Sequence, residues 1–190
     1  PPPPPPPPPP PFSSRRRHTR SCLKSRGLGD VYKRQVLVES ARIARGTIRD
    51  VAEVSADELD ALFLPGGFGA AKNLCDFAVK GPDCAVNGDV ANLVRAVHAQ
   101  GKPVAAVCIA PALLAKVLGD EKPELTIGTD ADTAGALETM GAAHVSCPVE
   151  EFVVDRDKKL ISSPAYMLAQ SISEAAEGIE KTVVELLRMA

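Results

Sequence analysis

The chain has 190 residues, of which 45% are hydrophobic and 24% charged, and its formal net charge is −2. This size suits one domain of ordinary length, and no apolar run approaches the roughly 18 residues that a membrane span needs. Eight of the 22 Lys and Arg residues lie within the first 35 residues, which hold only one of the 24 acidic residues. The acidic remainder carries no basic stripe. We therefore expect neither a membrane nor a nucleic acid as a partner.

The first 35 residues differ in kind from the rest of the chain. Pro1 to Pro11 form a homopolymer, either a polyproline tail of low complexity or a ligand for an aromatic-lined groove. The segment from Phe12 to Gln35 resembles the translated read-through of a sequencing adapter, and the composition changes abruptly at Val36. We predict that residues 1–35 are disordered and artefactual, and that residues 36–190 form the domain.

The next segment, residues 36–64, predicts short elements. A helix is expected over 36–45, because Gly46 would end it, and residues 47–49 are expected to be extended. Ser55 and Glu58 have the spacing of a capping box at the start of a helical turn. Residues 62–64 form a compact apolar strand that runs into Pro65-Gly66-Gly67.

From there, strands and helices alternate along the chain. Helices are expected over 86–100, 109–118 and 130–140, and a long final helix over 166–189, either continuous or broken near Gly178. Strands are expected at 104–107, 125–127, 144–145, 152–155 and 160–161, the last two paired through a turn. This alternation predicts an α/β layered sandwich with a mostly parallel sheet.

Cys108 is the leading candidate for chemistry. The apolar strand expected at 104–107 ends at this thiol, and residues that favour a helix follow at once. A thiol at such a corner would project out of the sheet, beside helix N-terminal N–H groups that favour the thiolate. The alternative is a small buried cysteine with no chemical role, and the local sequence leaves both interpretations open.

Other strand ends carry weaker signals. Gly66 and Gly67 follow a strand, where glycine lets backbone N–H groups approach an anion closely. Thr129 and Asp130 follow another strand as natural helix caps, and they would face the same pocket. His144 and His98 are interpreted as structural and solvated residues, respectively.

The cysteines indicate the compartment. Their number is odd, they show neither a C-x-x-C pair nor zinc-ligand spacing, and no secretory signal precedes them. We therefore expect free thiols in the reducing cytoplasm, and no metal site. The five residues are Cys22, Cys75, Cys84, Cys108 and Cys147.

Several motifs taken together resemble the ElbB family of isoprenoid-biosynthesis glyoxalases, within the PfpI and class I glutamine-amidotransferase-like superfamily. The resemblance covers essentially all of residues 36–190 and implies a flavodoxin-like, three-layer fold. The motifs are Leu-Pro-Gly-Gly-Phe-Gly-Ala-Ala-Lys-Asn at 64–73, Val-Cys-Ile-Ala-Pro-Ala at 107–112, Leu-Thr-Ile-Gly-Thr-Asp at 125–130, Gly-Ala-Ala-His-Val at 141–145, Cys-Pro-Val at 147–149 and Pro-Ala-Tyr-Met-Leu-Ala-Gln at 164–170.

The resemblance also implies roles for individual residues. Cys108 matches the nucleophile, and the backbone N–H groups of Gly67 and Ile109 match the oxyanion hole. The implied reaction converts a small aldehyde such as methylglyoxal or glyoxal to a hydroxy acid, without a cofactor or metal. Gly66, Thr129 and Asp130 are expected in the substrate pocket. Superfamily members are often dimers, so a homodimer is an expected assembly.

Two departures from the family pattern bear on activity. ElbB proteins carry a glutamate that partners the cysteine, in an Asp-Gly-Ser-Glu-type motif upstream of the region matching Val36, and no such motif occurs here. We therefore expect an N-terminally truncated chain that lacks one or more strands, with impaired activity. Many superfamily members have a histidine near the position of Gly128. This chain has glycine there instead, and the lack of the histidine is typical of ElbB proteins. The competing hypothesis is a non-catalytic protein that binds a small molecule or senses oxidants through Cys108.

Overall fold

The computed structural model describes residues 29–45 and 48–190, with side chains from residue 36 onward. The predictions for residues 1–28, and those that Gly46 ends a helix and that Thr47 is extended, lie outside the described residues. The chain divides into two compact units, Pro1–Asp50 and Val51–Ala190. Helix α2 (Gly29–Ala44) lies in the first unit and includes most of the helix predicted over 36–45.

A four-stranded sheet forms the centre of the second unit. Its strands are β1 (Leu62–Leu64), β2 (Val104–Val107), β6 (Leu160–Ser163) and β5 (Val153–Asp155), in the order β1-β2-β6-β5. The β1–β2 and β2–β6 pairs are parallel, whereas β5 pairs with β6 in the antiparallel sense. The mostly parallel sheet and the predicted pairing of the last two strands are confirmed.

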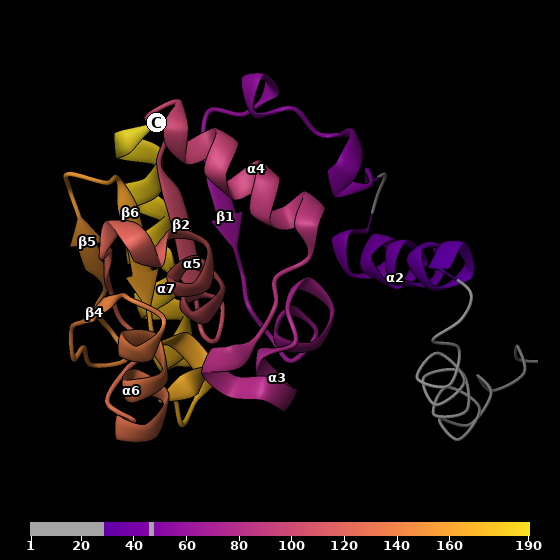
Figure 1. Ribbon diagram of the computed structural model, residues 1–190. Coiled ribbons are helices and arrows are strands. Elements are labelled where there is room, and N and C mark those ends of the chain that lie inside the picture. Colours follow the sequence, from indigo (N-terminus) through magenta and orange to yellow (C-terminus); the bar gives the residue numbers. More distant parts are fainter. Residues whose placement is uncertain (1–28, 46–47) are drawn as a thin grey trace, which may run out of the picture. The chain divides into compact units, whose positions relative to one another are not determined.

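Helices cover both faces of this sheet (Figure 1). On one face, α4 (Gly88–Ala99) and α5 (Pro111–Leu118) pack over Val104 and Ala106 to form the larger hydrophobic core. On the other face, Ala105 packs with Ile161 and with Leu186 of α7 (Ile172–Met189). Alternate residues of β2 therefore enter different cores, as expected for a strand buried on both sides.

A smaller two-stranded sheet extends the structure beyond β5 and β6. It pairs β3 (Glu124–Leu125) with β4 (Ala143–His144) in parallel, and α6 (Ala131–Thr139) connects the two strands. The backbone N–H of Thr126 donates a 2.8 Å hydrogen bond to Ser162 Oγ, joining the two sheets through buried groups. The predicted strand at 125–127 is shorter than expected because only its first residue pairs regularly with β4.

The remaining described elements are short. Ser55 and Glu58 form the predicted capping box at the second of five 3₁₀ turns, with the Ser55 N–H 3.1 Å from Glu58 Oε1. A π-helical turn, Ala70–Leu74, and helix α3, Phe77–Lys80, follow β1 and were not predicted. The 3₁₀ turns are Val51–Glu53, Ala56–Glu58, Gly81–Asp83, Gly119–Glu121 and Ala165–Met167.

The final helix differs from the prediction at its start but not at its centre. It begins at Ile172 rather than Tyr166, because Tyr166 belongs to a separate 3₁₀ turn and the Ser171 hydroxyl caps the new start. The helix is continuous through Gly178. A Cβ atom at Gly178 would lie 2.3 Å from the carbonyl oxygen of Val149, so the glycine permits close packing and causes no break.

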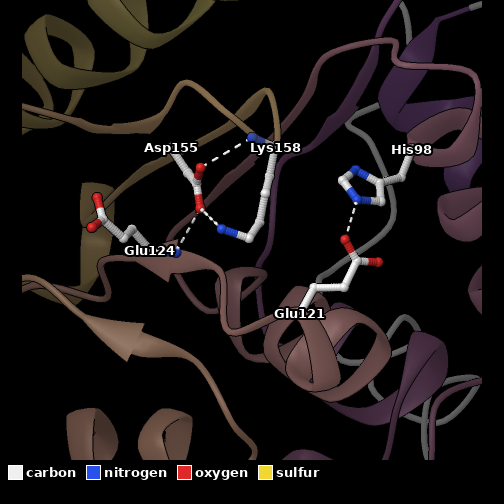
Figure 2. Close-up of polar contacts among 5 residues, drawn as sticks. All are labelled: His98, Glu121, Glu124, Asp155 and Lys158. Carbon is white, nitrogen blue, oxygen red and sulfur yellow. Dashed lines mark hydrogen bonds and ion pairs between the residues drawn. The ribbon is translucent and has the colours of Figure 1, made fainter.

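Charged contacts gather at the end of the sheet where β2 and β6 begin (Figure 2). The buried carboxylate of Asp155 accepts hydrogen bonds from the Glu124 N–H at 3.0 Å, the Lys158 N–H at 3.1 Å and the Lys158 ammonium at 3.0 Å. Burial raises the pKa of Asp155, but these donors outweigh it and hold the pKa below its usual value. The same end carries the pair between His98 Nε2 and Glu121 Oε2, at 2.9 Å.

No helix among residues 29–45 and 48–190 has the length and apolar character needed to cross a membrane.

Candidate functional site

Cys108 lies at the carboxyl end of β2, where the chain turns toward α5. Its backbone has φ = 61°, in the left-handed region that an L-residue rarely adopts. The Cys108 N–H donates a 3.0 Å hydrogen bond to the carbonyl of Ser163, and the Ala110 N–H donates to the Val107 carbonyl at 3.1 Å. Strained strand-to-helix turns of this kind present nucleophiles above a sheet. The thiol is partly exposed, as such a role requires.

The turn after β1 lies directly against this corner. Gly66 has φ = 79°, and a Cβ atom there would lie 2.5 Å from the Val107 carbonyl oxygen and 3.0 Å from Cys108 Cβ. Only glycine permits so close an approach of the two backbones. Because β1 and β2 are parallel neighbours, both turns leave the same edge of the sheet, which is where ligands bind in folds of this class.

A cavity of about 300 Å³ opens beside the thiol, and we call it the thiol cavity. Its walls come from the turn after β1, from α3, from the Cys108 corner and from the 3₁₀ turn that follows β6. Its lining is apolar apart from the thiol and backbone groups. The lining residues are Gly67, Phe68, Ala71, Phe77, Ala78, Cys108, Ile109 and Met167.

Gly67 and Ile109 both line the thiol cavity, as the oxyanion prediction requires. Within the described chain, neither backbone N–H donates a hydrogen bond to another residue. The Ile109 nitrogen would lie 3.3 Å from a Cβ atom placed on Gly66, which locates this donor at the contact between the two turns. Two uncommitted donors beside a thiol could bind the oxyanion of a tetrahedral adduct, and this role stays a prediction.

No carboxylate or imidazole is found among the described residues that line the cavity. His144 is occupied elsewhere, since its Nε2 accepts the Ile127 N–H at 3.4 Å. The prediction that His98 is solvated is wrong, because its side chain is largely buried and pairs with Glu121. No group of three or more His, Cys, Asp or Glu residues suited to a metal ion occurs in the described part of the chain.

The other described cysteines have different surroundings. Cys75, Cys84 and Cys147 are buried, and burial raises the pKa of each thiol. For Cys147, burial and the nearby Glu151 carboxylate raise the pKa to about 11. A thiol of this kind is almost entirely protonated at neutral pH and is a poor nucleophile. Cys108 is therefore the described thiol best placed for chemistry.

The predicted pocket residues take different positions. Gly66 lies against the Cys108 corner, and neither it nor Thr129 nor Asp130 is among the residues that line the thiol cavity. The Asp130 carboxylate caps α6: it accepts the Thr133 N–H at 2.9 Å and also the Thr133 hydroxyl. These two hydrogen bonds lower the pKa of Asp130. A substrate role for Thr129 and Asp130 stays a prediction.

Gly128 leaves no room for a larger residue. Its φ is 105°, and a Cβ atom there would lie 2.8 Å from Leu168 Cγ. The side chain that follows the Ala165–Met167 turn thus occupies the space next to this position. A histidine at 128 would require Leu168 to move.

Sequence reasoning missed much of the cavity wall. Phe77 and Ala78 belong to the unpredicted helix α3, and Met167 lies in a turn that was expected to be regular helix. One available signal was the rule that ligands gather at the carboxyl ends of parallel strands. Applied to β6, this rule indicates the turn at 165–167, because β6 ends at Ser163 beside Val107.

Comparison with known sequences gives a family match. Residues 35–171 match the DJ-1/PfpI family. The human glutamine amidotransferase-like class 1 domain-containing protein 3, mitochondrial, is 44% identical over 165 residues, which cover 82% of this chain and 61% of the human protein. The rat ES1 protein homolog, mitochondrial, is 42% identical with the same coverage. The chain thus spans less than two thirds of the length of these relatives.

Solved structures give a consistent result. An isoprenoid biosynthesis protein with an amidotransferase-like domain from Ehrlichia chaffeensis superposes with a TM-score of 0.73 at 34% identity, covering 81% of this chain and 70% of that one. The Francisella tularensis Rapid Encystment Protein 24 KDa shares the fold, with a TM-score of 0.52 at 18% identity, over 77% of this chain and 67% of the other. The flavodoxin-like, amidotransferase-like fold and the predicted family resemblance are confirmed.

Proposed function

The chain belongs to the DJ-1/PfpI family, and from this premise we propose that it carries an ElbB-like glyoxalase site with Cys108 as the nucleophile. The observation that carries the proposal is the Cys108 corner itself. A partly exposed thiol with φ = 61° lies beside two uncommitted backbone N–H groups in an open cavity. The substrates are small 2-oxoaldehydes such as methylglyoxal, or glyoxal itself.

The reaction begins with attack of the Cys108 thiolate on the aldehyde carbon. The carbonyl π electrons move to oxygen, and the N–H groups of Gly67 and Ile109 stabilise the resulting oxyanion until it gains a proton as a hemithioacetal. The hydrogen on the former aldehyde carbon then leaves as a proton, and a proton is added to the neighbouring carbon, which gives a 2-hydroxyacyl thioester. Water cleaves this thioester to the hydroxy acid and restores the thiol.

The proton shift needs a base, and the described lining of the thiol cavity supplies none. The base must therefore come from outside this lining, solvent included. For this reason we expect slow turnover by the chain, with hemithioacetal formation easier to detect than product.

Lactate formation from methylglyoxal tests the proposal. We expect the Cys108→Ser variant to form lactate at least about tenfold more slowly than the parent chain, since it lacks the nucleophile. The matched control, Cys147→Ser, removes a buried thiol and should retain the parent rate at equal folded concentration. Equal rates for the parent chain and Cys108→Ser would overturn the catalytic proposal.

A second candidate function is oxidant sensing, which the lack of a base in the described lining favours. A Cys108 thiolate that attacks hydrogen peroxide forms a sulfenic acid and releases hydroxide, and no acid–base partner on carbon is needed. Peptide-resolved mass spectrometry after peroxide treatment would show oxidation at Cys108 before Cys147. Rapid oxidation together with no aldehyde chemistry would select this function over the first.

We propose the cytoplasm as the compartment, from the unpaired thiols and their number. Two relatives carry mitochondrial names, which apply to those proteins. Fractionation of the source cells with an antibody to the chain would decide between the compartments.

A further inference from the structure

The thiol cavity is larger and more apolar than methylglyoxal requires. Its volume is about 300 Å³, and its walls include the side chains of Phe77, Ile109 and Met167. An apolar cavity of about 150 Å³ in another protein is large enough for benzene, and drug-sized ligands occupy cavities from about 300 Å³ upward. A methyl substituent would leave most of this space unfilled.

The mouth of the cavity is also apolar. Phe68 lines the cavity, yet 70% of its surface is exposed, so a large apolar side chain faces solvent beside the thiol. The Lys72 ammonium lies 4.4 Å from the centroid of the Phe68 ring, a cation–π contact that favours a defined ring position. A flat aromatic group entering the cavity would cover this ring.

Polar substrates fit the cavity poorly. The described lining contains no polar side chain apart from the thiol, so a hydroxyl group of the substituent would lose water without gaining a side-chain partner. Polyhydroxylated 2-oxoaldehydes are therefore disfavoured. The uncommitted donors of the lining are the backbone N–H groups of Gly67 and Ile109, which the proposed function assigns to the oxygen of the reacting carbonyl.

We propose that the thiol cavity selects 2-oxoaldehydes whose substituent is apolar and larger than methyl, aryl groups above all. This inference rests on the proposed function, because it names the substrate class of the same site. The adduct is the same hemithioacetal: the sulfur bonds to the aldehyde carbon, and the carbonyl oxygen takes up a proton. The substituent enters the space between Phe68, Phe77 and Met167.

Protection of Cys108 from iodoacetamide measures this selection without the need for turnover. The 190-residue chain is alkylated in the presence of methylglyoxal or phenylglyoxal, and the Cys108 peptide is quantified by mass spectrometry. The same pair of aldehydes is measured with N-acetylcysteine, which gives their intrinsic difference in thiol affinity. After this correction, phenylglyoxal should half-protect Cys108 at a concentration at least about tenfold lower, because its ring removes more apolar surface from water.

Two neighbouring substitutions on α3 show whether the cavity causes the difference. Ala78 lines the cavity and is exposed, so Ala78→Leu fills space without disturbing the core. Val79 is 73% exposed and does not line the cavity, so Val79→Leu is the matched control. Ala78→Leu should reduce the corrected advantage of phenylglyoxal over methylglyoxal to less than about threefold, whereas Val79→Leu should retain the full advantage.

The outcomes separate the two proposals. If methylglyoxal protects Cys108 as well as phenylglyoxal does after correction, or if Ala78→Leu and Val79→Leu behave alike, the inference about the substrate class is wrong and the proposed function stands. If neither aldehyde protects Cys108 at any concentration below that needed for N-acetylcysteine, the proposed function itself fails.

Discussion

The two ends of the central sheet differ in chemistry. Where β2 and β6 begin, the buried carboxylate of Asp155 pairs with the partly exposed ammonium of Lys158, and His98 pairs with Glu121 (Figure 2). Where β1 and β2 end, the thiol cavity has an apolar lining with no charged side chain among the described residues. Charges at the first end have partners within the fold. Uncommitted donors and a partly exposed thiol lie at the second end.

We infer from this difference that the groups at the first end stabilise the fold, whereas those at the second end are available for chemistry. The hydrogen bonds of Asp155 join β3, β5 and the turn before β6, so their loss should weaken the fold without reaching the cavity. In contrast, the left-handed backbone of Cys108 and the uncommitted N–H of Ile109 contribute nothing evident to stability. Strain and uncommitted donors are typical of a site that is completed by a ligand.

Thiol reactivity should show the largest contrast within the chain. At pH 8, a thiol with a pKa of about 11 is ionised only to about one part in a thousand, and Cys147 is also buried. We expect iodoacetamide to label Cys108 at least about 100-fold faster than Cys147, as read from the two peptides under native conditions. Similar rates for the two thiols would remove the distinction between the corner and the core.

The close contact at Gly66 can be broken selectively. Gly66→Ala would place a Cβ atom 2.5 Å from the Val107 carbonyl oxygen, in a backbone conformation with φ = 79°. The combined overlap and strain should lower the free energy of unfolding by about 3 kcal/mol and slow Cys108 labelling. Gly67→Ala is the control, because φ is similar, at 83°, but nothing lies within 4 Å of its Cβ position. It should cost only about 1 kcal/mol in denaturant unfolding.

The charged end of the sheet predicts the opposite pattern. Asp155→Asn should lower the free energy of unfolding by about 2 kcal/mol at pH 7, since a buried charge-assisted network is lost, while Cys108 labelling is unchanged. The exposed neighbour Asp157 provides the control variant, Asp157→Asn, with an expected change within about 0.5 kcal/mol.

The difference in the free energy of unfolding between the parent chain and Asp155→Asn should depend on pH with a defined sign. Because the folded-state pKa of Asp155 lies below its ordinary value of 3.8, its stabilising contribution is fully present above that value. It is lost as the pH falls through the folded-state pKa. The stability gap between the parent chain and Asp155→Asn should therefore be constant from about pH 7 to 5 and close below about pH 4. A gap that widens on acidification would contradict the assignment.

The smallest effect is expected at the exposed partner of His98. Glu121 is half exposed, with a side-chain exposure of 51%, so Glu121→Gln should change the free energy of unfolding by about 0.5 kcal/mol or less. Cys108 labelling should be unaffected. A loss comparable to that of Asp155→Asn would show that the two contacts at this end are energetically alike.

The sequence predicted the corner well because the corner depends on local signals. The run Val104–Val107 is apolar at every position and becomes a fully buried strand with the predicted bounds. Pro111 starts the following helix two residues later than predicted, because Cys108 to Ala110 form the turn. The glycines after β1 were recognised for the same reason, since their residue type demands a special backbone.

The cavity wall and the ionic end were not predictable in the same way. Helix α3 is four residues long and is stabilised by contacts with neighbouring turns rather than by its own periodicity. Asp155 ends a strand pattern, and only the folded arrangement of β3 shows that it is buried with Glu124 and Lys158 as partners. The burial of Asp155 thus depends on a distant segment, and α3 depends on the turns on either side of it, so neither feature has a periodic signal of its own.

The ¹³C NMR spectrum of the chain mixed with methylglyoxal labelled at the aldehyde carbon tests the central claim most directly. The experiment is done in a Cys22→Ser background, because Cys22 lies outside the described residues. We predict a hemithioacetal resonance in this background and with Cys147→Ser added, and its loss with Cys108→Ser added. A resonance that persists unchanged after Cys108→Ser, or that never forms in the parent background, would contradict the assignment of Cys108 as the nucleophile.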